Sequence, residues 1–481
     1  MVDSGRPAFH FTPPVNWMND PNGLVYHNGE YHLFYQHHPE SIVWGPMHWG
    51  HAVSRDLVDW QHLPIALHPD ERGMIFSGSA VVDKHNTAGF GANALVAIFT
   101  CHKDYVETQN LAYSHDDGRT WTKYAGNPVL PAQDAYRNFR DPKVFWFEDH
   151  WVMCLAAGRQ ILFYISRDLK HWEQSSIFGD GHSARDDVWE TPDLFPLSVE
   201  TSDEKRWVLT TGVWNGAIAG GSGTQYFIGH FDGRTFTSER SAETVLWMDH
   251  GADFYAPQSW NNEPEGRRLL VGWMSNWQYA KLVPASTWRG AFSLIREVSL
   301  KKVHDEVHLL QRPLPEMQRL RAEHFRWQEK TVQPSTNLLA DLHADSLEIL
   351  ATFAWDGNVS RFGLRVRLGE EEQTSIYYDM HEQKLCVDRS QSGQVDFHDM
   401  FAAVHSAPLL PIDGLIRLHV FVDAVSIEVF ANEGLLTFSE SIFPSQQSQG
   451  LELFVEGGSI FLHSVDVFYL NPARFQMAEK S

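Results

Sequence analysis

Alternation of apolar and polar residues at every second position is the feature that most constrains the fold of this chain. Short runs of this kind cover residues 29–35, 144–155 and 268–273, and Gly, Asn, Asp or Pro residues bound them. A period of two residues is that of a half-buried β-strand, whereas an amphipathic helix repeats every 3.6 residues. Almost no long helical period occurs before residue 300. The sequence therefore predicts an all-β fold.

The first 300 residues contain a weak internal repeat in which Ser and Asp precede an aromatic residue. Each copy predicts a hairpin turn, because the Asp side chain caps its own backbone and the aromatic ring packs between sheets. The copies recur about every 50 to 65 residues, which matches one four-stranded blade of a β-propeller with insertions. We therefore expect a five-bladed β-propeller over residues 1–300. The copies are Ser54 to Trp60, Ser114 to Trp121, Ser166 to Trp172 and a remnant at Phe231 to Phe236.

The sequence changes character after the propeller region. Residues 311–315 read Gln-Arg-Pro-Leu-Pro, and the charge-rich segment 316–330 that follows has a helix-like pattern. We interpret residues 301–335 as a linker between two domains. Beyond it, runs of period two return with turn residues between them, so we expect a C-terminal β-sandwich over residues 336–481.

The balance of charge excludes two classes of partner. The chain of 481 residues has 38 Lys and Arg against 61 Asp and Glu, which gives a formal net charge of -23. Such a charge repels phosphate backbones and anionic lipid surfaces, and no apolar stretch approaches the roughly 18 residues of a membrane span. We therefore expect neither a nucleic acid nor a membrane as a partner. The oligomeric state stays open.

The N-terminal residues, the cysteines and the histidines bear on location and metal content. The first residues lack the apolar core of a signal peptide, so we expect a cytoplasmic protein, or a secreted or periplasmic one whose signal peptide is absent from this sequence. Cys101, Cys154 and Cys386 are too few and too scattered for a disulfide framework, and we expect buried free thiols. The 26 histidines show no zincin-type spacing, so we expect no metal.

The segment 16–23 reads Asn-Trp-Met-Asn-Asp-Pro-Asn-Gly and stands just before the apolar strand 24–26. Pro21 fixes its own φ and removes a backbone donor, so Asp20 is held at a rigid strand entrance. A nucleophilic carboxylate requires such a fixed direction. An Asx-turn without any chemistry is the alternative interpretation of these turn-forming residues.

This octapeptide resembles the signature of glycoside hydrolase family 32, the family of invertases, inulinases and levanases. Four further segments resemble the motifs of the family in the same order along nearly the whole chain. They are Leu-Phe-Tyr-Gln at 33–36, Ile-Phe-Ser-Gly-Ser at 75–79, Phe-Arg-Asp-Pro at 139–142 and Trp-Glu-Thr-Pro-Asp at 189–193. The resemblance implies that Asp20 is the nucleophile, that Glu190 is the acid/base, and that Asp141 binds two fructose hydroxyls. It implies no cofactor.

The chemistry of a retaining glycosidase fits this assignment. Cleavage passes through an oxocarbenium-like transition state, which needs an ionised carboxylate on one face of the sugar and a proton donor at the leaving oxygen. We expect Asp20 to be ionised by hydrogen bonds from nearby donors, and the pKa of Glu190 to be raised by partial burial and a neighbouring negative charge. Arg140 is expected to keep Asp141 charged. Thr191 stands where many members of the family have Cys, which can alter the local tuning of Glu190.

The resemblance also implies a shell of substrate-binding residues around these carboxylates. Their polar atoms would contact sugar hydroxyls and their rings would exclude water. Trp277 is an alternative to Trp273, and a core position is the alternative for either. The expected shell is Asn19, Gln36, Trp44, Trp49, Phe76, Ser77, Arg140, Tyr255 and Trp273.

The function implied by the resemblance is a β-fructofuranosidase that releases fructose from sucrose, fructo-oligosaccharides, inulin or levan by double displacement. Three alternatives stay open. A fructosyltransferase would share the glycosyl-enzyme intermediate. A carbohydrate-binding protein would use the same aromatic pocket without turnover. A sialidase-type enzyme would need an arginine cluster, and we find no matching set of arginines in the sequence.

Overall fold

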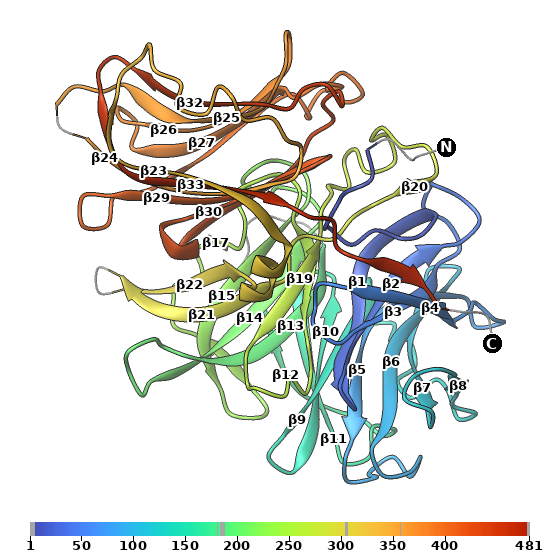
Figure 1. Cartoon of the computed structure of the whole chain (residues 1–481). Coiled ribbons are helices and arrows are strands. Elements are labelled where there is room, and N and C mark those ends of the chain that lie inside the picture. The colour runs from blue at the N-terminus through green and yellow to red at the C-terminus, as the bar shows by residue number, and fades with distance from the viewer. Residues whose placement is uncertain (1–4, 180, 183–187, 304–305, 356, 479–481) are drawn as a thin grey trace.

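The computed structural model describes residues 5–179, 181–182, 188–303, 306–355 and 357–478 (Figure 1). Within these residues the chain forms β-strands, and its only helices are two short 3-10 helices, η1 (Pro315–Leu320) and η2 (Asn432–Gly434). The predicted all-β class is therefore confirmed. None of the helices in this part of the chain is long and apolar enough to cross a membrane.

Five sheets of the described residues form a ring, and each contributes one inner strand. These strands are β1 (Asn16–His27), β5 (Met74–Asp83), β9 (Phe139–Phe147), β13 (Trp189–Ser198) and β18 (Tyr255–Ser259). Each inner strand contacts the next one in this order, and β18 contacts β1 again. This closed ring is a β-propeller, the architecture that the repeat predicts.

The other propeller strands pair outward from the inner ones. The first sheet continues through β2 (Glu30–His38), β3 (His48–Ser54) and β4 (Trp60–Leu67), and the second through β6 (Ala94–Lys103), β7 (Val106–Ser114) and β8 (Thr122–Lys123). The third contains β10 (His150–Ala157), β11 (Gln160–Ser166) and β12 (Glu173–Phe178). The fourth contains β14 (Lys205–Val213), β15 (Gly223–Phe231), β16 (Phe236–Ser238) and β17 (Leu246–Trp247). The fifth contains β19 (Leu269–Trp273), β21 (Arg296–Val303) and β22 (Glu306–Pro313).

The repeated Ser and Asp residues form the predicted turns. Each copy lies where the third strand of a sheet turns into the fourth, as between β3 and β4. The carboxylate of Asp56 accepts hydrogen bonds from the backbone N–H groups of Val58 and Asp59. Asp116 and Asp168 cap their turns in the same way. The repeat is therefore structural and marks the outer edge of the blades.

Two sheets of the C-terminal part pack face to face as a β-sandwich, and Leu, Ile, Val and Phe side chains fill the space between them. One sheet has the order β23 (Arg321–Val332), β33 (Ile460–Leu470), β24 (Leu347–Trp355), β29 (Ile416–Asp423), β30 (Ser426–Ala431) and β31 (Leu436–Ser441). The other has the order β28 (Val404–Pro408), β27 (Lys384–Gln391), β26 (Gln373–Asp379), β25 (Arg361–Leu368) and β32 (Gly450–Glu456). The sandwich predicted from period two is therefore present.

The segment interpreted as a linker, 301–335, contains strands of both domains. β22 completes the fifth propeller sheet and β23 forms an edge of the sandwich, so only η1 and its flanking residues connect them. We propose that the two domains meet at η1. The helix expected over 316–330 is wrong beyond Leu320, because Phe325 and Trp327 follow a period of two and pack on the sandwich core while charged neighbours face outward.

Buried charges join the two domains. Arg389 of β27 lies 2.5 Å from Asp253, just before β18, and Arg296 of β21 lies 2.8 Å from Glu428 of β30. All four of these side chains are fully shielded from solvent. Such pairs are costly to break, because removal of one partner leaves a buried charge unpaired. The sandwich is therefore fixed against the end of the propeller at which β18 begins.

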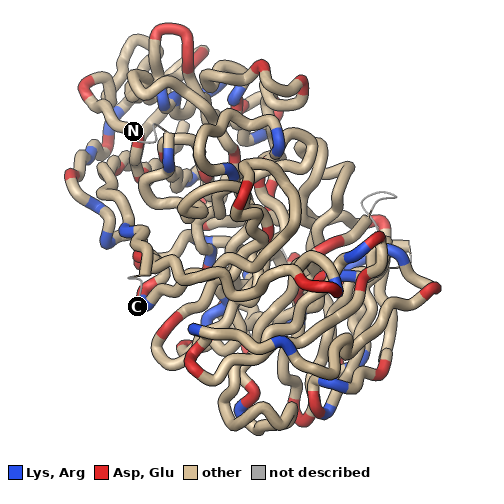
Figure 2. Tube along the Cα trace, turned by 90° about the vertical axis from the view of Figure 1, so that its right-hand side faces the viewer, with Lys and Arg blue, Asp and Glu red and all other residues tan. Residues whose placement is uncertain are grey.

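Two short strands extend the first sheet at its two edges. β20 (Trp288–Arg289) pairs in parallel with β1, and β34 (Phe475–Met477) pairs in parallel with β4, so the red C-terminal strand lies beside the blue first sheet in Figure 1. In the view of Figure 2, acidic and basic residues intermix along the loops and strand edges. That view shows no broad basic face.

Candidate active site

A β-bulge interrupts every inner strand of the propeller close to its start. In each case two residues of the inner strand lie opposite one residue of its neighbour, which bends the strand and redirects its side chains. The bulged pairs are Asn19-Asp20, Phe76-Ser77, Asp141-Pro142, Thr191-Pro192 and Ala256-Pro257. Because the inner strands form a ring, these irregular positions lie together at one end of it. Most of the residues predicted for the site stand in these pairs or directly before them.

Backbone strain marks three of the five bulges. Asp141, Thr191 and Ala256 have φ values of 65°, 48° and 51°, in the left-handed region that residues other than glycine seldom adopt. Each of them precedes a proline. Strain of this kind persists where the surrounding structure imposes it, and it is common at functional sites.

Asp20 is held by two side-chain donors. The Ser77 hydroxyl donates to Oδ2 at 2.7 Å, and the Asn19 amide donates to Oδ1 at 3.0 Å. Asn19 is itself held by the Trp17 indole, which donates to its Oδ1 at 2.7 Å. The carboxylate of Asp20 therefore has one fixed orientation at the first bulge, as the sequence predicts for this position.

Glu190 accepts hydrogen bonds from two side chains on neighbouring blades. Arg140 donates to Oε1 through Nε at 3.1 Å and through NH2 at 2.7 Å. Tyr255 donates its hydroxyl to Oε2 at 2.5 Å. Residues of β9, β13 and β18 therefore meet at this carboxylate. Gly212 lies opposite Glu190 on β14, and a Cβ there would come within 2.9 Å of the Tyr255 ring, so the close approach of that ring requires glycine.

Asp141 is bound to the backbone of the next blade. Its Oδ2 accepts the N–H of Thr191 at 2.9 Å, and its own N–H donates to the Thr100 hydroxyl at 3.0 Å. The structure thus places Asp141 between the second and fourth blades. The Thr191 that replaces the usual Cys contributes its backbone N–H, while its buried hydroxyl has no partner among the described residues.

The three carboxyl groups influence one another electrostatically. Burial, followed by the charge of Glu190, raises the pKa of Asp20 to about 6, although Ser77 and Asn19 donate to it. The expected hydrogen bonds are therefore present, but they do not outweigh desolvation. Burial also raises the pKa of Asp141 well above its ordinary value, and the charges of Glu190 and Asp20 add to this rise against the opposing effect of Arg140. Close like charges favour one shared proton.

Arg140 is the cation of the site, and a residue absent from the predicted set supports it. Glu107 accepts a 3.1 Å hydrogen bond from NH1 of Arg140, and Asn138 accepts a second at 2.9 Å. His102 lies 3.2 Å from the same Glu107 oxygen. Although burial opposes it, the His102 hydrogen bond and the charge of Arg140 hold the pKa of Glu107 below its ordinary value. No sequence motif marks Glu107, which stands in the ordinary strand β7.

The aromatic residues of the predicted shell divide into two groups. Phe76 and Trp44 are partly exposed, and their rings meet edge to face at 6.2 Å. Trp49 is fully buried and donates its indole N–H to the Phe76 carbonyl at 3.0 Å, so it supports the second bulge from behind. Gln36 is also buried and donates to Asn22 at 2.8 Å, directly below the first bulge.

Trp273 occupies the core position that the sequence left as an alternative. It is fully buried and packs against Trp17 and Trp277, with ring centroids 6.0 and 4.7 Å away. Trp277 retains partial exposure and stacks on Trp17. The tryptophan cluster therefore supports the strand that carries Asn19 and Asp20.

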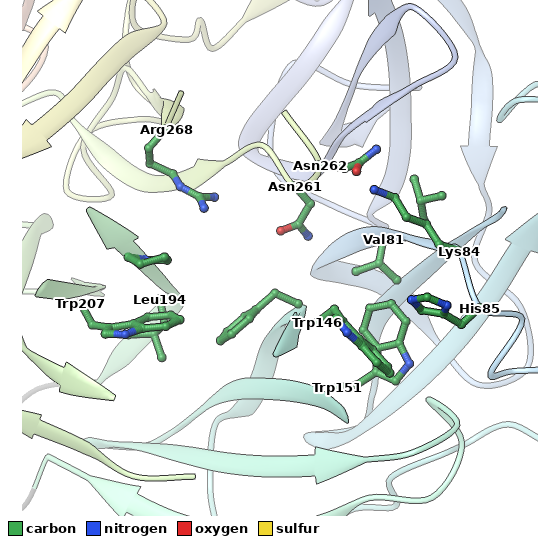
Figure 3. A pocket seen from close by; sticks show the side chains of 13 residues that line it. Val81, Lys84, His85, Trp146, Trp151, Leu194, Trp207, Asn261, Asn262 and Arg268 are labelled. Atoms are coloured by element: carbon green, nitrogen blue, oxygen red, sulfur yellow. The ribbon is translucent and has the colours of Figure 1, made fainter. Parts of the chain in front are cut away.

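A separate cavity of about 320 Å³ lies at the other end of the same inner strands (Figure 3). Val81 of β5, Phe145 of β9 and Leu194 of β13 line it, two to four residues beyond the bulges of those strands. Its lining includes Lys84 and Arg268 but no Asp or Glu. This cavity therefore lacks the pair of carboxylates that glycoside cleavage requires.

The family models match this chain over both domains. The model of the glycosyl hydrolases family 32 N-terminal domain matches residues 10–313, and the model of the C terminal of the same family matches residues 316–469. The division between them falls next to η1.

Curated relatives and solved structures agree with these matches. A levanase of Bacillus subtilis (strain 168) is 50% identical, over 96% of this chain and 70% of that protein. The extracellular exo-inulinase inuE of Aspergillus ficuum is 39% identical, over 96% of this chain and 94% of that protein. The crystal structure of an exo-inulinase from Aspergillus awamori superposes with a TM-score of 0.92 at 36% identity, covering 98% of this chain and 99% of that chain. A fructofuranosidase variant of Schwanniomyces occidentalis complexed with fructosylnystose has a TM-score of 0.90 at 32% identity, with the same coverage.

Proposed function

Because this chain belongs to glycosyl hydrolases family 32, we propose that it is a retaining β-fructofuranosidase that releases fructose from the end of sucrose or fructan substrates. The observation that carries the proposal is the meeting of Asp20, Asp141 and Glu190 at, or directly before, the bulges of three blades, where the charge of Glu190 raises the pKa of both aspartates. The relatives are named as levanase and exo-inulinase, and neither the transferase nor a non-catalytic binding protein is favoured by them.

In the first step, a carboxylate oxygen of Asp20 attacks the anomeric carbon of the fructosyl unit while Glu190 gives its proton to the leaving oxygen. The bond between that carbon and the leaving oxygen breaks, and a fructosyl ester of Asp20 forms. Glu190 then has a negative charge, which the Arg140 guanidinium and the Tyr255 hydroxyl stabilise through the hydrogen bonds that they already make. Donors already in place favour this step, because they need no reorganisation.

In the second step, Glu190 takes a proton from a water molecule, and the water oxygen attacks the same carbon. Fructose leaves and Asp20 regains its carboxylate. Ser77 and Asn19 keep Asp20 directed at the anomeric carbon in both steps. Asp141 is proposed to bind fructose hydroxyls through hydrogen bonds that become stronger as the ring flattens.

The preferred substrate bears on whether this enzyme acts inside or outside the cell. The relative from Aspergillus ficuum is named an extracellular exo-inulinase, so the site of action of that enzyme lies outside the cell. We infer that this chain acts there if inulin or levan, and not sucrose, is its preferred substrate. Rates on sucrose, inulin and levan, followed by chromatography over time, test this preference. Fructose as the sole product of a polymer would indicate cleavage from the chain end.

The test of the proposed mechanism uses Asp20→Asn and Glu190→Gln. Each is expected to lower kcat by about 10³ to 10⁵-fold, which corresponds to about 4 to 7 kcal/mol of lost transition-state stabilisation. Glu173→Gln, on the outer strand β12, is the matched control and should keep the wild-type rate. Normal turnover in either site variant would contradict the proposed roles, and a wild-type protein that released no fructose from any of the three substrates would contradict the proposed function.

A further inference from the structure

An exposed tryptophan follows strand β14 beside the acid/base. Glu190 of β13 pairs with Gly212 of β14, and Trp189 pairs with Val213. The Trp214 N–H donates to the Val188 carbonyl at 3.1 Å, which extends this ladder by one residue. Residues that face each other across an antiparallel pair share a side of the sheet, and alternate residues of one strand do so too. Glu190, Gly212 and Trp214 therefore lie on one side.

The packing of the neighbouring residues confirms which side this is. Trp189 and Val213, on the opposite side, are buried in the core between the third and fourth blades. Gly212 faces the Tyr255 ring, whose hydroxyl binds Glu190. Trp214 thus belongs to the active-site side of β14. It lies two residues beyond Gly212, a rise of about 7 Å along the strand, which is close to the length of one sugar ring.

Packing within the protein does not account for this side chain. Trp214 is 49% exposed, whereas Trp17, Trp49, Trp189 and Trp273 are completely buried. In the part of the chain that the structure describes, the Trp214 indole has neither a ring partner nor a hydrogen bond. An exposed ring beside a catalytic carboxylate offers a flat apolar face to a ligand.

The loop that begins at Trp214 is fixed in place. The Asn276 amide donates to the carbonyls of Gly220 and Ser222 at 3.0 and 3.2 Å, and the Ala217 N–H donates to the Gly221 carbonyl at 3.0 Å. A Cβ at Gly221 would come within 2.2 Å of Asn276, so the loop and this side chain are in close contact. Ile218 of the same loop is 51% exposed. The loop therefore holds its apolar side chains towards solvent in an ordered arrangement.

We infer that Trp214 forms the wall of a leaving-group subsite and stacks on the sugar unit that Glu190 protonates. This inference rests on the proposed function, because Glu190 has to touch the glycosidic oxygen and the leaving sugar lies on the far side of that oxygen. The apolar C–H face of an uncharged sugar ring suits the exposed face of an indole. The occupant is thus the second sugar unit of sucrose or of a fructan chain. Ile218 extends the apolar surface towards the third sugar unit of a fructan chain.

Substrates that differ only in the leaving group test this inference. Trp214→Ala should lower kcat/KM on inulin, levan and short fructo-oligosaccharides by about fivefold to twentyfold, since one stacking contact is lost. The same variant should hydrolyse methyl β-fructofuranoside, whose leaving group has no ring, within about twofold of the wild-type rate. Trp214→Phe should recover most of the lost activity. Inhibition by free fructose, which fills only the fructose pocket, should not change.

Ile177→Ala is the matched control, because Ile177 is 46% exposed on the outer strand β12. It should leave all rates unchanged. Equal losses of Trp214→Ala on methyl fructoside and on the oligosaccharides would overturn the inference, as would no loss on any substrate. The thermal midpoint and the circular dichroism spectrum of each variant separate these outcomes from misfolding. Failure of the proposed function itself would appear differently, as a wild-type protein that releases no fructose.

Discussion

The hydroxyl of Tyr255 lies 2.5 Å from Oε2 of Glu190, on the side of the carboxylate opposite to Arg140. The two donors come from different blades, and both are buried. Glu190 therefore has no freedom to turn, and the negative charge that it acquires during the reaction is already solvated by the protein.

Tyr255→Phe removes one donor to Glu190 and keeps the ring that packs against Gly212. We expect kcat to fall by about 10 to 10²-fold, because a preorganised donor to a developing charge is lost. The rate on sucrose and the melting temperature would be measured together. Tyr164→Phe, which removes a hydroxyl bound to Gln133 away from the site, is the control. Equal effects of both variants would contradict a role of the Tyr255 hydroxyl in stabilising the charge on Glu190.

Activity should fall in acid as Asp20 becomes protonated. Burial and the charge of Glu190 raise the pKa of Asp20 to about 6, so kcat/KM should decline about tenfold per pH unit below that value. Ser77→Ala removes a donor that stabilises the ionised form, and this loss raises the pKa further. The acid limb of the pH profile should therefore move to higher pH. Ser176→Ala, on the outer strand β12, should leave the limb in place, and an unmoved limb in Ser77→Ala would contradict the assignment.

Asp141→Asn keeps the shape of the side chain and the hydrogen bond from the Thr191 N–H. We expect kcat to fall more than KM rises, since bonds to fructose hydroxyls that tighten in the transition state are weakened. Steady-state kinetics on sucrose would separate the two constants. An unchanged kcat would remove Asp141 from the site, and an altered circular dichroism spectrum would point to a structural role instead.

The stability of the domain interface should decline in alkali because of His10. Its ring lies 2.8 Å from Asp423 and 3.0 Å from Glu428, both in the sandwich. Burial alone would lower the pKa of His10, but these two carboxylates raise it to about 9 from the ordinary 6.5. The stabilisation is thus complete below about pH 6.5 and is lost as the pH rises through about 9. It amounts to about 3 kcal/mol.

The measurement compares melting temperatures of the wild type and His10→Gln at pH 6 and pH 9.5. The wild type should lose more stability between these values than the variant does, because only the wild type loses the charge on His10. A parallel decline of both proteins would show that other groups control the alkaline limit. His308→Gln, in a partly exposed position on β22, serves as the matched substitution.

The sequence predicts the blades well because each blade repeats a local signal. Asp56, Asp116 and Asp168 cap turns by contacts within four residues of themselves, and local contacts of this kind are legible in sequence. Four of the five bulges leave a trace in the sequence too, since a proline follows Asp20, Asp141, Thr191 and Ala256. That recurrence is a local signal of the bulged positions.

Other parts of the site depend on contacts between distant segments. Period two places Trp49 and Trp273 on strands, but it does not say which face of each strand meets another sheet, so the burial of Trp49 was not predicted and that of Trp273 was only one of two alternatives. Glu107 binds Arg140 only because the second and third blades are neighbours in the ring. The pKa of Asp20 depends on how completely the ring shields it, which no local pattern expresses. The catalytic roles of the three carboxylates stay predictions until the variants are measured.

The parallel pairing of β34 with β4 has a consequence for the order of assembly. During synthesis, β4 emerges early with one unsatisfied edge, and its partner is made only after the entire sandwich. The free edge of the first blade is therefore open to pairing with other chains until β34 has left the ribosome. Loss of a few residues around Phe475 would leave that edge bare for the lifetime of the protein, so a small truncation far from the carboxylates would promote aggregation before it altered catalysis.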